Sequence, residues 1–402
     1  MLKVLELFAG IGACSKALTN LGIEHEIVDA VEIDKYAIKS FNAVHGTNFE
    51  PQDITKWDKD IECDLIMHGS PCQDFSVAGL GKGGDKGSGT RSSLMYETLR
   101  IVEKLKPKYV IWENVKNLLS KKHRHNFDAY LQAMGDLGYH SDYKVLNAKD
   151  YGIPQNRERV FTVSIRKDLE AEFMAFDFPE PIELKTKLKD ILEPVVDEKF
   201  YLSDEQVASF KAESDKQTAK GYGFAFKPRT TDTYASTIST RAGQRKTDNF
   251  LMEENVEIID NIYNNRPERH YTKAAPTLRA DRQGLKVAIR TANQKGYSKG
   301  VVELNKTPKH QQDLIQHENG LCRTIPAGTH GSTPHLLKTA TRDYRIRKLT
   351  PKECWRLMGF ADEDFEKAKN AGVSNSQLYK QAGNSIVVNV LMRILKNLLG
   401  EL

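Results

Sequence analysis

Short apolar runs alternate with amphipathic segments over the first 165 residues of the chain. Five apolar runs have the length of buried strands, at residues 2–7, 27–31, 64–67, 109–112 and 160–165. Four segments between them have a helical period of apolar positions, at residues 15–21, 35–44, 94–105 and 126–137. This strand–helix alternation predicts an α/β fold with a doubly wound, mostly parallel sheet.

The pattern changes after residue 178, where long periodic stretches become few. Thr, Gly, Asn, Arg and Lys are frequent there, which predicts short strands and long loops in a smaller, mainly β domain. Helical patterns return at residues 351–358 and 386–399, and the second is strongly apolar, so we expect it to cover the first domain. The predicted division is a first domain over residues 1–178 and 376–402, a second over 179–345 and a connecting segment over 346–375.

A short Thr-containing element recurs three times in the second region. The copies are Ser236-Thr237-Ile238, Pro276-Thr277-Leu278 and Arg323-Thr324-Ile325. Their separations are in the range of small structural repeats. Two interpretations stay open, namely tandem units or one extended domain whose strands and turns share a composition.

Charge is distributed unevenly along the 402 residues, although the formal net charge is only +5. Residues 1–220 contain 30 Lys+Arg and 36 Asp+Glu, a difference of −6, whereas residues 221–402 contain 29 and 18, a difference of +11. A basic C-terminal half favours a polyanionic partner, although a basic solvated surface would give the same count.

Composition argues against several classes of protein. Hydrophobic residues at 39% and charged residues at 28% are typical of a globular chain. No apolar run approaches the roughly 18 residues of a membrane span, and the N-terminal segment is too short and too acidic for a signal peptide. The five Cys form no CxxC pair and no Cys/His ligand spacing, so we expect no disulfide framework, no metal site and a cytoplasmic location.

Small and acidic residues follow the first two predicted strands. Phe8-Ala9-Gly10-Ile11-Gly12 joins a strand to a helix, and glycines there let the backbone approach a ligand closely. Glu32 lies 20 residues beyond Gly12, the offset at which a carboxylate accepts the hydroxyls of a ribose, and Asp53 follows. Because Ser15 replaces the third glycine of GxGxxG, the set favours a nucleoside-containing cofactor over a dinucleotide.

Cys72 follows an apolar run within Gly69-Ser70-Pro71-Cys72. Ligands of such sheets lie at the carboxyl ends of the strands, so the thiol is a candidate nucleophile, with a buried structural thiol as the alternative. The Gly-rich segment 79–93 is expected to act as a lid. Glu113 ends the next strand, and Arg157 and Arg159 precede another, so a carboxyl and two guanidinium groups are expected at the same edge.

Eight motifs occur in one order along nearly the whole chain. They are Phe8-Ala9-Gly10-Ile11-Gly12, Glu32-Ile33-Asp34-Lys35-Tyr36-Ala37, Asp53-Ile54, Pro71-Cys72-Gln73, Glu113-Asn114-Val115, Gln155-Asn156-Arg157-Glu158-Arg159, Arg347-Lys348-Leu349-Thr350-Pro351-Lys352-Glu353-Cys354 and Gln381-Ala382-Gly383-Asn384-Ser385. In this order they resemble the C5-cytosine-specific DNA methyltransferases of bacterial and phage restriction–modification systems. The resemblance implies a Rossmann-like methyltransferase domain, with a variable target-recognition domain over about residues 180–345.

The resemblance also implies a site for S-adenosylmethionine, which leaves as S-adenosylhomocysteine. Phe8 would stack on the adenine, Glu32 would accept the ribose hydroxyls, and Asp53 would contact the adenine amino group. Asn384 and Ser385 would close the pocket. Ile33 stands where many relatives have Trp, which affects only the packing on that face. The other cofactor-binding residues implied are Gly10, Ile11, Gly12, Ile54, Pro71 and Leu94.

The implied reaction begins when Cys72 adds to C6 of a flipped-out cytosine, which makes C5 nucleophilic enough to attack the methyl group. Glu113 would protonate or hydrogen-bond the ring at N3, Arg159 would hold O2, and Arg157 would support the site. A base that the sequence does not identify removes H5, and Cys72 is expelled. The resemblance implies no metal.

Double-stranded DNA is the implied substrate. Gln73 and Ser76 would contact it beside the nucleophile, and a Thr followed by an aliphatic residue would grip the backbone of the flipped nucleotide. Thr324 is our first choice for that Thr, and Thr277, with Arg279 beside it, is the second. If the three repeated elements were tandem recognition units, they would imply more than one target sequence. A cognate restriction endonuclease and a monomeric state are further expectations.

Three other activities can be compared with DNA cytosine methylation. A transfer-RNA cytosine methyltransferase of similar fold would have a compact recognition region, whereas about 165 residues lie there. A non-catalytic DNA-binding relative would lack Cys72, Glu113 or the cofactor residues, and all are present. An amino-methyltransferase would contain a D/N-P-P-Y/F run, which the sequence lacks.

Overall fold

The chain forms two compact units in the computed structural model. Unit 1 comprises Met1–Phe200, Ala208–Phe250 and Lys348–Leu402, and unit 2 comprises Tyr201–Val207 and Leu251–Arg347. The structure describes residues 1–71, 94–221, 226–240, 242, 248–255, 258–260, 269–271, 286–288, 301–303 and 343–400. These units are defined by packing, so the functional division at residues 178, 345 and 375 stays a prediction.

Unit 1 is built on a six-stranded sheet in the order β2-β1-β3-β4-β7-β5. The strands are β1 (Leu2–Leu7), β2 (His25–Val31), β3 (Leu65–His68), β4 (Tyr109–Val115), β5 (Tyr139–Asn147) and β7 (Glu158–Arg166). β2, β1, β3 and β4 are parallel neighbours, whereas β7 is antiparallel to both β4 and β5. The predicted mostly parallel α/β sheet is therefore confirmed, and the antiparallel edge is an addition that the sequence pattern did not predict.

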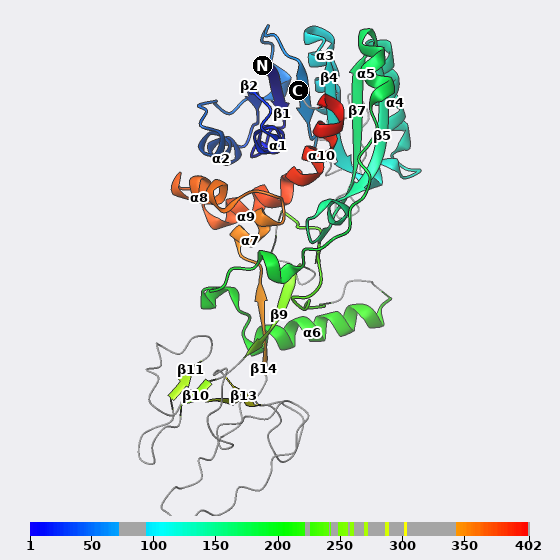
Figure 1. Ribbon diagram of the computed structural model, residues 1–402. Coiled ribbons are helices and arrows are strands. Elements are labelled where there is room, and N and C mark those ends of the chain that lie inside the picture. Colours follow the sequence, from blue (N-terminus) through cyan, green and yellow to red (C-terminus); the bar gives the residue numbers. More distant parts are fainter. Residues whose placement is uncertain are drawn as a thin grey trace, which may run out of the picture. The chain divides into compact units, whose positions relative to one another are not determined.

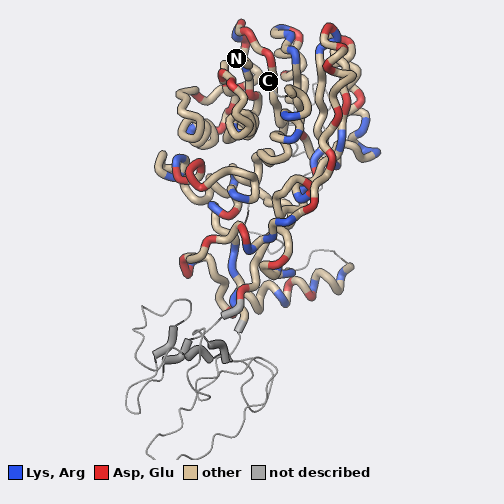
Figure 2. The backbone as a smooth tube through the Cα atoms, viewed as in Figure 1, with Lys and Arg blue, Asp and Glu red and all other residues tan. Residues whose placement is uncertain are grey.

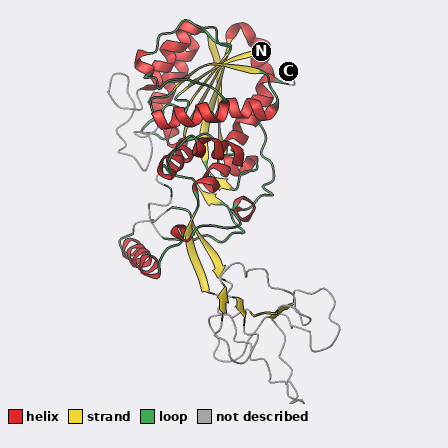
Figure 3. Ribbon diagram, turned by 90° about the vertical axis from the view of Figure 1, so that its left-hand side faces the viewer, coloured by secondary structure: helices red, strands yellow, loops and turns green. Residues whose placement is uncertain are grey.

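Helices cover both faces of this sheet, as the two views of the ribbon show (Figure 1, Figure 3). They are α1 (Ala13–Leu21), α2 (Lys35–His45), α3 (Met95–Leu105), α4 (Arg124–Asp136), α5 (Glu170–Ala175) and α10 (Val388–Leu399). The 3₁₀ turns between them are η1 (Ile54–Lys56), η3 (Lys116–Leu119), η4 (Ala148–Tyr151) and η5 (Lys167–Leu169). The apolar terminal helix α10, red in Figure 1, packs against α1 at the other end of the sequence.

The main core lies between the sheet and helices α3 and α4. Alternate residues of the strands, such as Leu5 and Leu7, point to this face because side chains alternate across a strand. They pack with Met95 of α3 and with Phe127 and Tyr130 of α4, all of which are fully buried. Burying each such side chain contributes about 1.5–3 kcal/mol, so the core fixes the strand ends firmly.

The segment from residue 179 to residue 250 contains more helix than its composition predicts. Two 3₁₀ turns, η6 (Leu188–Ile191) and η7 (Glu198–Phe200), precede helix α6 (Asp204–Ala219). No residue of α6 is buried, so its sequence carries no apolar stripe by which a helix could be recognised. In unit 1, the short strand β8 (Ala235–Ser236) runs parallel to β6 (Gln155–Asn156).

Three helices follow the second region, namely α7 (Pro351–Arg356), α8 (Asp362–Asn370) and α9 (Asn375–Asn384). A capping box begins α7, because Thr350 Oγ1 accepts the N–H of Glu353 at 3.2 Å and Glu353 Oε2 accepts that of Thr350 at 2.8 Å. Pro351 occupies the first turn, where its missing N–H costs nothing. These signals lie within the Arg347–Cys354 motif, so part of that motif specifies a helix start.

Unit 2 contains short paired strands. β10 (Ile258–Asp260) pairs with β11 (Arg269–Tyr271), and β12 (Lys286–Ala288) pairs with β13 (Val301–Glu303), and both of these pairs are antiparallel. β9 (Phe250–Asn255) pairs with β14 (Asp343–Lys348). Arg347 of β14 is fully buried and its Nε lies 2.6 Å from Glu253 Oε1, so an ion pair joins these two strands.

Lys and Arg alternate with Asp and Glu over the described helices and strands of unit 1 (Figure 2). Much of the basic stretch from residue 221 to residue 344 lies outside the described residues. The predicted polyanion-binding surface there therefore stays a prediction. No helix in the described part of the chain is long and apolar enough to cross a membrane.

Candidate active site

A left-handed turn joins β1 to α1 at the carboxyl end of the sheet. Phe8, Gly10 and Gly12 have φ values of 53°, 58° and 79°. Glycine adopts this region freely, whereas Phe8 adopts it at an energetic cost of about 1–3 kcal/mol. Ile11 between the glycines is buried. The turn predicted from Phe8-Ala9-Gly10-Ile11-Gly12 is therefore present, and its backbone is strained. The N–H of Gly10 and the carbonyl oxygen of Ile11 form hydrogen bonds with neighbouring elements.

His45, at the end of α2, supports this turn. Its Nε2 lies 3.2 Å from the carbonyl oxygen of Ile11, and its ring packs on Phe41 at 4.6 Å between centroids. A Cβ at position 12 would lie 2.1 Å from that nitrogen, so only glycine fits there. Burial lowers the pKa of His45 to about 4, which keeps the imidazole neutral and able to donate to Ile11.

Glu32, the residue that follows β2, binds the same turn. Its Oε2 accepts the N–H of Gly10 at 3.0 Å and its Oε1 accepts that of Asp34 at 2.8 Å. Burial raises the pKa of Glu32, and these two N–H bonds oppose that rise. Each carboxylate oxygen keeps a further lone pair for a ligand hydroxyl. Ile33 beside it is 70% exposed and leaves an apolar surface next to the carboxylate.

Gln52, which precedes Asp53, holds this segment beside Glu32, because its N–H donates to the Glu32 carbonyl oxygen at 2.8 Å. Asp53 accepts the N–H and the hydroxyl of Thr55, at 3.0 and 2.8 Å, and these bonds lower its pKa. Ile54 is buried behind it. Gly10, Glu32 and the segment of Asp53 therefore lie together at the ends of β1 and β2, and their assignment to a nucleoside site stays a prediction.

Glu113 lies near the end of β4 and forms an ion pair with Arg159 of β7. Arg159 Nε is 2.9 Å from Glu113 Oε1, and both side chains are largely buried. Burial raises the pKa of Glu113, while the charges of Arg159 and Arg157 oppose the rise. Because the Arg159 guanidinium lies against Oε1, a proton on this carboxyl group would be held on Oε2.

The Glu113 carboxyl also lies beside the chain that leads to Cys72. A Cβ built on Gly69 would lie 3.7 Å from Glu113 Oε2 and 3.4 Å from Cδ1 of Ile386. The carboxyl group therefore lies between β7 and the end of β3. Pro71 is the last described residue on this side, and Leu94, which packs against the core at the start of α3, is the first on the other.

Arg157 is buried and its guanidinium donates to three backbone carbonyl oxygens. Nη2 donates to Gly383 at 3.1 Å and to Ser385 at 2.8 Å, and Nη1 donates to Ile238 at 3.2 Å. Arg157 thus fixes the end of α9, where Asn384 is exposed and Ser385 is buried. These contacts hold the end of α9 next to the segment that precedes β7.

The end of α9 is also tied to α2. Gln381 Oε1 accepts the Ser40 hydroxyl at 3.0 Å, and its Nε2 donates to the Tyr36 carbonyl oxygen at 2.8 Å. Lys380 forms an ion pair with Asp34, the residue whose carboxylate caps α2. Sequence patterns did not single out His45 or Ser40, because their contacts involve segments that are distant in sequence.

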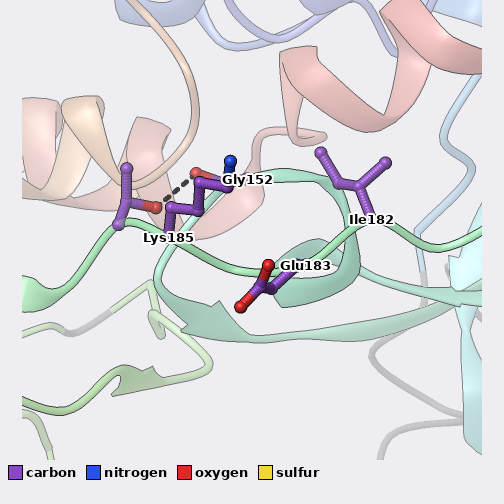
Figure 4. A pocket seen from close by; sticks show the side chains of 5 residues that line it. Gly152, Ile182, Glu183 and Lys185 are labelled. Carbon is purple, nitrogen blue, oxygen red and sulfur yellow. Dashed lines mark hydrogen bonds between the residues drawn. The ribbon is translucent and has the colours of Figure 1, made fainter.

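Several predicted site residues lie outside the described residues. They are Cys72, Gln73 and Ser76, the expected lid at residues 79–93, and Thr277, Arg279 and Thr324. Within the described part of the chain, no group of three or more His, Cys, Asp or Glu side chains could hold a metal ion. A shallow pocket lined by Gly152, Ile182, Glu183, Lys185 and Thr186 shares no residue with the candidate site (Figure 4).

Replacing Gly383 by alanine should destabilise unit 1. The added Cβ would lie 2.4 Å from the carbonyl carbon of Ser239 and 2.4 Å from the nitrogen of Thr240, both of which are backbone atoms that cannot rotate away. We expect a loss of about 1–3 kcal/mol in the free energy of unfolding, measured by urea titration. Gly135→Ala is the matched control within α4, where a Cβ meets nothing within 4 Å, and should stabilise by about 0.4–1 kcal/mol. Equal effects of both substitutions would contradict the collision.

Acid should destabilise the protein through His45. Its pKa is about 4 when folded against an ordinary 6.5, so the unfolded chain binds more protons between these values. The stabilisation is complete above pH 6.5 and is lost as pH falls towards 4, by about 3 kcal/mol in total. His45→Gln should therefore show a smaller difference than wild type between unfolding free energies at pH 7.5 and pH 5. An unchanged difference would show that the imidazole is not held neutral.

Comparison with known proteins agrees with the eight motifs. The model of the C-5 cytosine-specific DNA methylase family matches residues 2–400. The chain is 33% identical to the orphan methyltransferase M.SPRI of Bacillus phage SPR, over 99% of this chain and 97% of that protein. It is 30% identical to the type II methyltransferase M2.ScrFI of Lactococcus lactis subsp. cremoris, over 99% of each. The solved structure of the S. pombe Dnmt2 methyltransferase shares the fold, with a TM-score of 0.60 at 18% identity over 99% and 98% of the two chains. The chain therefore belongs to the C-5 cytosine-specific DNA methylase family and is a DNA cytosine-5-methyltransferase.

Proposed function

We propose that this enzyme transfers the methyl group of S-adenosylmethionine to carbon 5 of a flipped-out cytosine in a specific double-stranded DNA sequence. The transfer proceeds through a covalent adduct between Cys72 and C6. The observation that carries the proposal is the buried Glu113–Arg159 pair at the end of β4, with the Glu113 carboxyl next to Gly69. Gly69 precedes Cys72 by three residues in the sequence.

The residues around the ends of β1 and β2 fit the adenosyl part of this cofactor. Glu32 offers acceptor oxygens for two ribose hydroxyls, and exposed Ile33 offers an apolar surface for the adenine ring. Phe8 would stack on the adenine, Asp53 would accept a hydrogen bond from its amino group, and Asn384 and Ser385 would close the pocket. The bound cofactor supplies a methyl group on a positively charged sulfur, which is the electrophile of the reaction.

Glu113 supports the chemistry at the target ring. A carboxyl group whose pKa is raised by burial retains its proton longer than an exposed one, so it can donate to N3 of the cytosine. Arg159 then donates to O2 of the same ring. This arrangement prevents negative charge from building up on the ring while the nucleophile adds.

Cys72 acts as the nucleophile in its thiolate form. The thiolate forms a bond to C6, the electron pair of the C5–C6 double bond moves to C5, and C5 takes the methyl group. A base then removes the proton from C5, the C5–C6 double bond forms again, and the thiolate leaves. The ring must be unstacked for this attack, at a cost of a few kcal/mol.

The proposed partner is duplex DNA, gripped by the basic stretch of residues 221–344, which contains 19 Lys+Arg and 12 Asp+Glu. The proposed contacts are Gln73, Ser76 and one repeated Thr. Thr324 is the first choice for that Thr, and Thr277, with Arg279 beside it, is the second. Relatives named type II methyltransferases support a cognate restriction endonuclease as a partner, and relatives named orphan methyltransferases support its absence. We further propose that the enzyme is a cytoplasmic monomer.

Bisulfite sequencing of DNA from a host that expresses the protein tests the proposal. We expect protected cytosines within one short sequence context, or within more than one if the repeated elements are separate recognition units. Transfer RNA from the same host serves as the competing substrate and should stay unmethylated. Protection of transfer RNA alone, or no protected DNA cytosine from a folded and cofactor-binding protein, would contradict the proposal.

A further inference from the structure

A buried hydroxyl ties the end of β3 to β4. Trp112 Nε1 donates to Ser70 Oγ at 3.0 Å. Asn114 Nδ2 lies 3.3 Å from the same Oγ and 3.3 Å from the carbonyl oxygen of Ser70. The exposed fractions of Ser70, Trp112 and Asn114 are 4%, 1% and 1%, so water does not replace these bonds. We call these three residues the Ser70 clasp.

The direction of the Trp112 N–H is fixed by the core. The indole stacks on His68 at 5.7 Å and 4°, and it also packs on Tyr130 at 4.1 Å and on Phe127 at 5.8 Å, all between ring centroids. His68 Nε2 lies 2.9 Å from the hydroxyl of Tyr130. The indole therefore cannot rotate away from Ser70 without disrupting a close-packed aromatic cluster.

The direction of the Asn114 amide is fixed as well. Its Oδ1 accepts the N–H of Val115 at 2.8 Å, which leaves Nδ2 to face Ser70. Trp112 and Asn114 are the residues on either side of Glu113 in β4, and side chains alternate along a strand. The clasp therefore holds the backbone on both sides of Glu113 to the chain that leads to Cys72.

We propose that Ser70 is a positioning residue for methyl transfer, because its hydroxyl sets the chain entering Cys72 relative to the Glu113 carboxyl. The proposal rests on the proposed function, in which Cys72 and Glu113 act on opposite parts of one ring. Nothing in the sequence motif requires a hydroxyl at position 70. A purely structural serine would lower stability when removed but leave the rate per folded molecule unchanged.

The test is a double-mutant cycle on the full-length enzyme. Ser70→Ala removes the acceptor, Trp112→Phe removes the donor while keeping an aromatic ring, and the double variant removes both. Ser164→Ala is the matched control, since Ser164 is equally buried in β7 and its Oγ lies 2.7 Å from that of Ser141. Each variant is assayed for the single-turnover methylation rate at saturating DNA and cofactor, for adduct formation with a 5-fluorocytosine duplex, and for the Kd of the cofactor.

We expect Ser70→Ala to slow both rates by about 10–100-fold, since a misplacement of about 1 Å costs on the order of 100-fold. The Kd of the cofactor should stay within about twofold of the wild-type value. Trp112→Phe should slow both rates to a similar extent as Ser70→Ala. The double variant should be no slower than the slower single variant. Ser164→Ala should react at the wild-type rate. If Ser70→Ala lowers the folded fraction, Trp112→Phe decides the question alone.

Two outcomes would overturn the inference. Wild-type rates in Ser70→Ala would show that the hydroxyl only satisfies buried donors, and multiplicative losses in the double variant would show that the two residues act separately. Failure of the covalent mechanism itself looks different, because the wild-type enzyme would then form no adduct with 5-fluorocytosine DNA while still methylating cytosine.

Discussion

Cys72→Ser should abolish methyl transfer, lowering the rate by at least roughly 10⁴-fold, as removal of a covalent nucleophile commonly does. A serine hydroxyl is a far weaker acid than a thiol and supplies almost no anion to attack C6. Binding of the cofactor and of duplex DNA should persist, because the residues proposed for them are retained. Transfer of a labelled methyl group to DNA, with isothermal titration for binding, measures both effects.

A second thiol provides the control for this substitution. Cys63 lies before β3, where burial raises the pKa of its thiol to about 12, so it does not ionise near neutral pH. Cys63→Ser should therefore keep its activity and still be trapped by a 5-fluorocytosine duplex, as shown by mass spectrometry. Trapping of Cys72→Ser by that duplex would contradict the assignment of the nucleophile.

Glu113→Gln should slow methyl transfer by about 10²–10⁴-fold, the usual contribution of a general acid or base. The amide has nearly the same shape, but its N–H groups are far too weakly acidic to transfer a proton to N3. Since burial raises the pKa of Glu113, the proton-carrying form predominates below that pKa and is lost as pH rises through it. The pH profile of the wild-type single-turnover rate should therefore have a limb that falls with rising pH, and Glu113→Gln should lose that limb.

Glu62→Gln removes the same charge at an exposed position before β3, where Glu62 pairs with Lys3. This control should keep the wild-type rate and pH profile. A Glu113→Gln enzyme that works at the wild-type rate would show that neither the proton nor the negative charge of Glu113 is needed.

Sequence patterns predicted those parts of the fold that rest on local periodicity. β1 and most other apolar strands of the sheet are where the pattern placed them, because each is buried on both faces. β5 was missed, since its exposed and buried residues mix polar and apolar types. The antiparallel place of β5 beside β7 depends on pairing between strands, which period alone does not specify. α6 was missed because none of its residues is buried.

The candidate site likewise contains some residues that sequence patterns reveal and others that they do not. The turn at Gly10 and Gly12 and the carboxylate of Glu32 are visible in the sequence, because glycine and acidic residues at strand ends have specific physical uses. His45 and Ser70 carry no such signal. They act through one carbonyl oxygen and one indole N–H that come near only when the strands have packed.

Arg157 and α10 impose an order of events on synthesis. The guanidinium binds the carbonyl oxygen of Ser385, 228 residues further along the chain, and α10 packs against α1, which is far from it in the sequence. A growing chain therefore exposes the apolar side of α1 until α10 has been synthesised, and the many distant contacts slow the closure of the domain. The catalytic motifs that precede α10 therefore emerge from the ribosome before the domain that holds them can close.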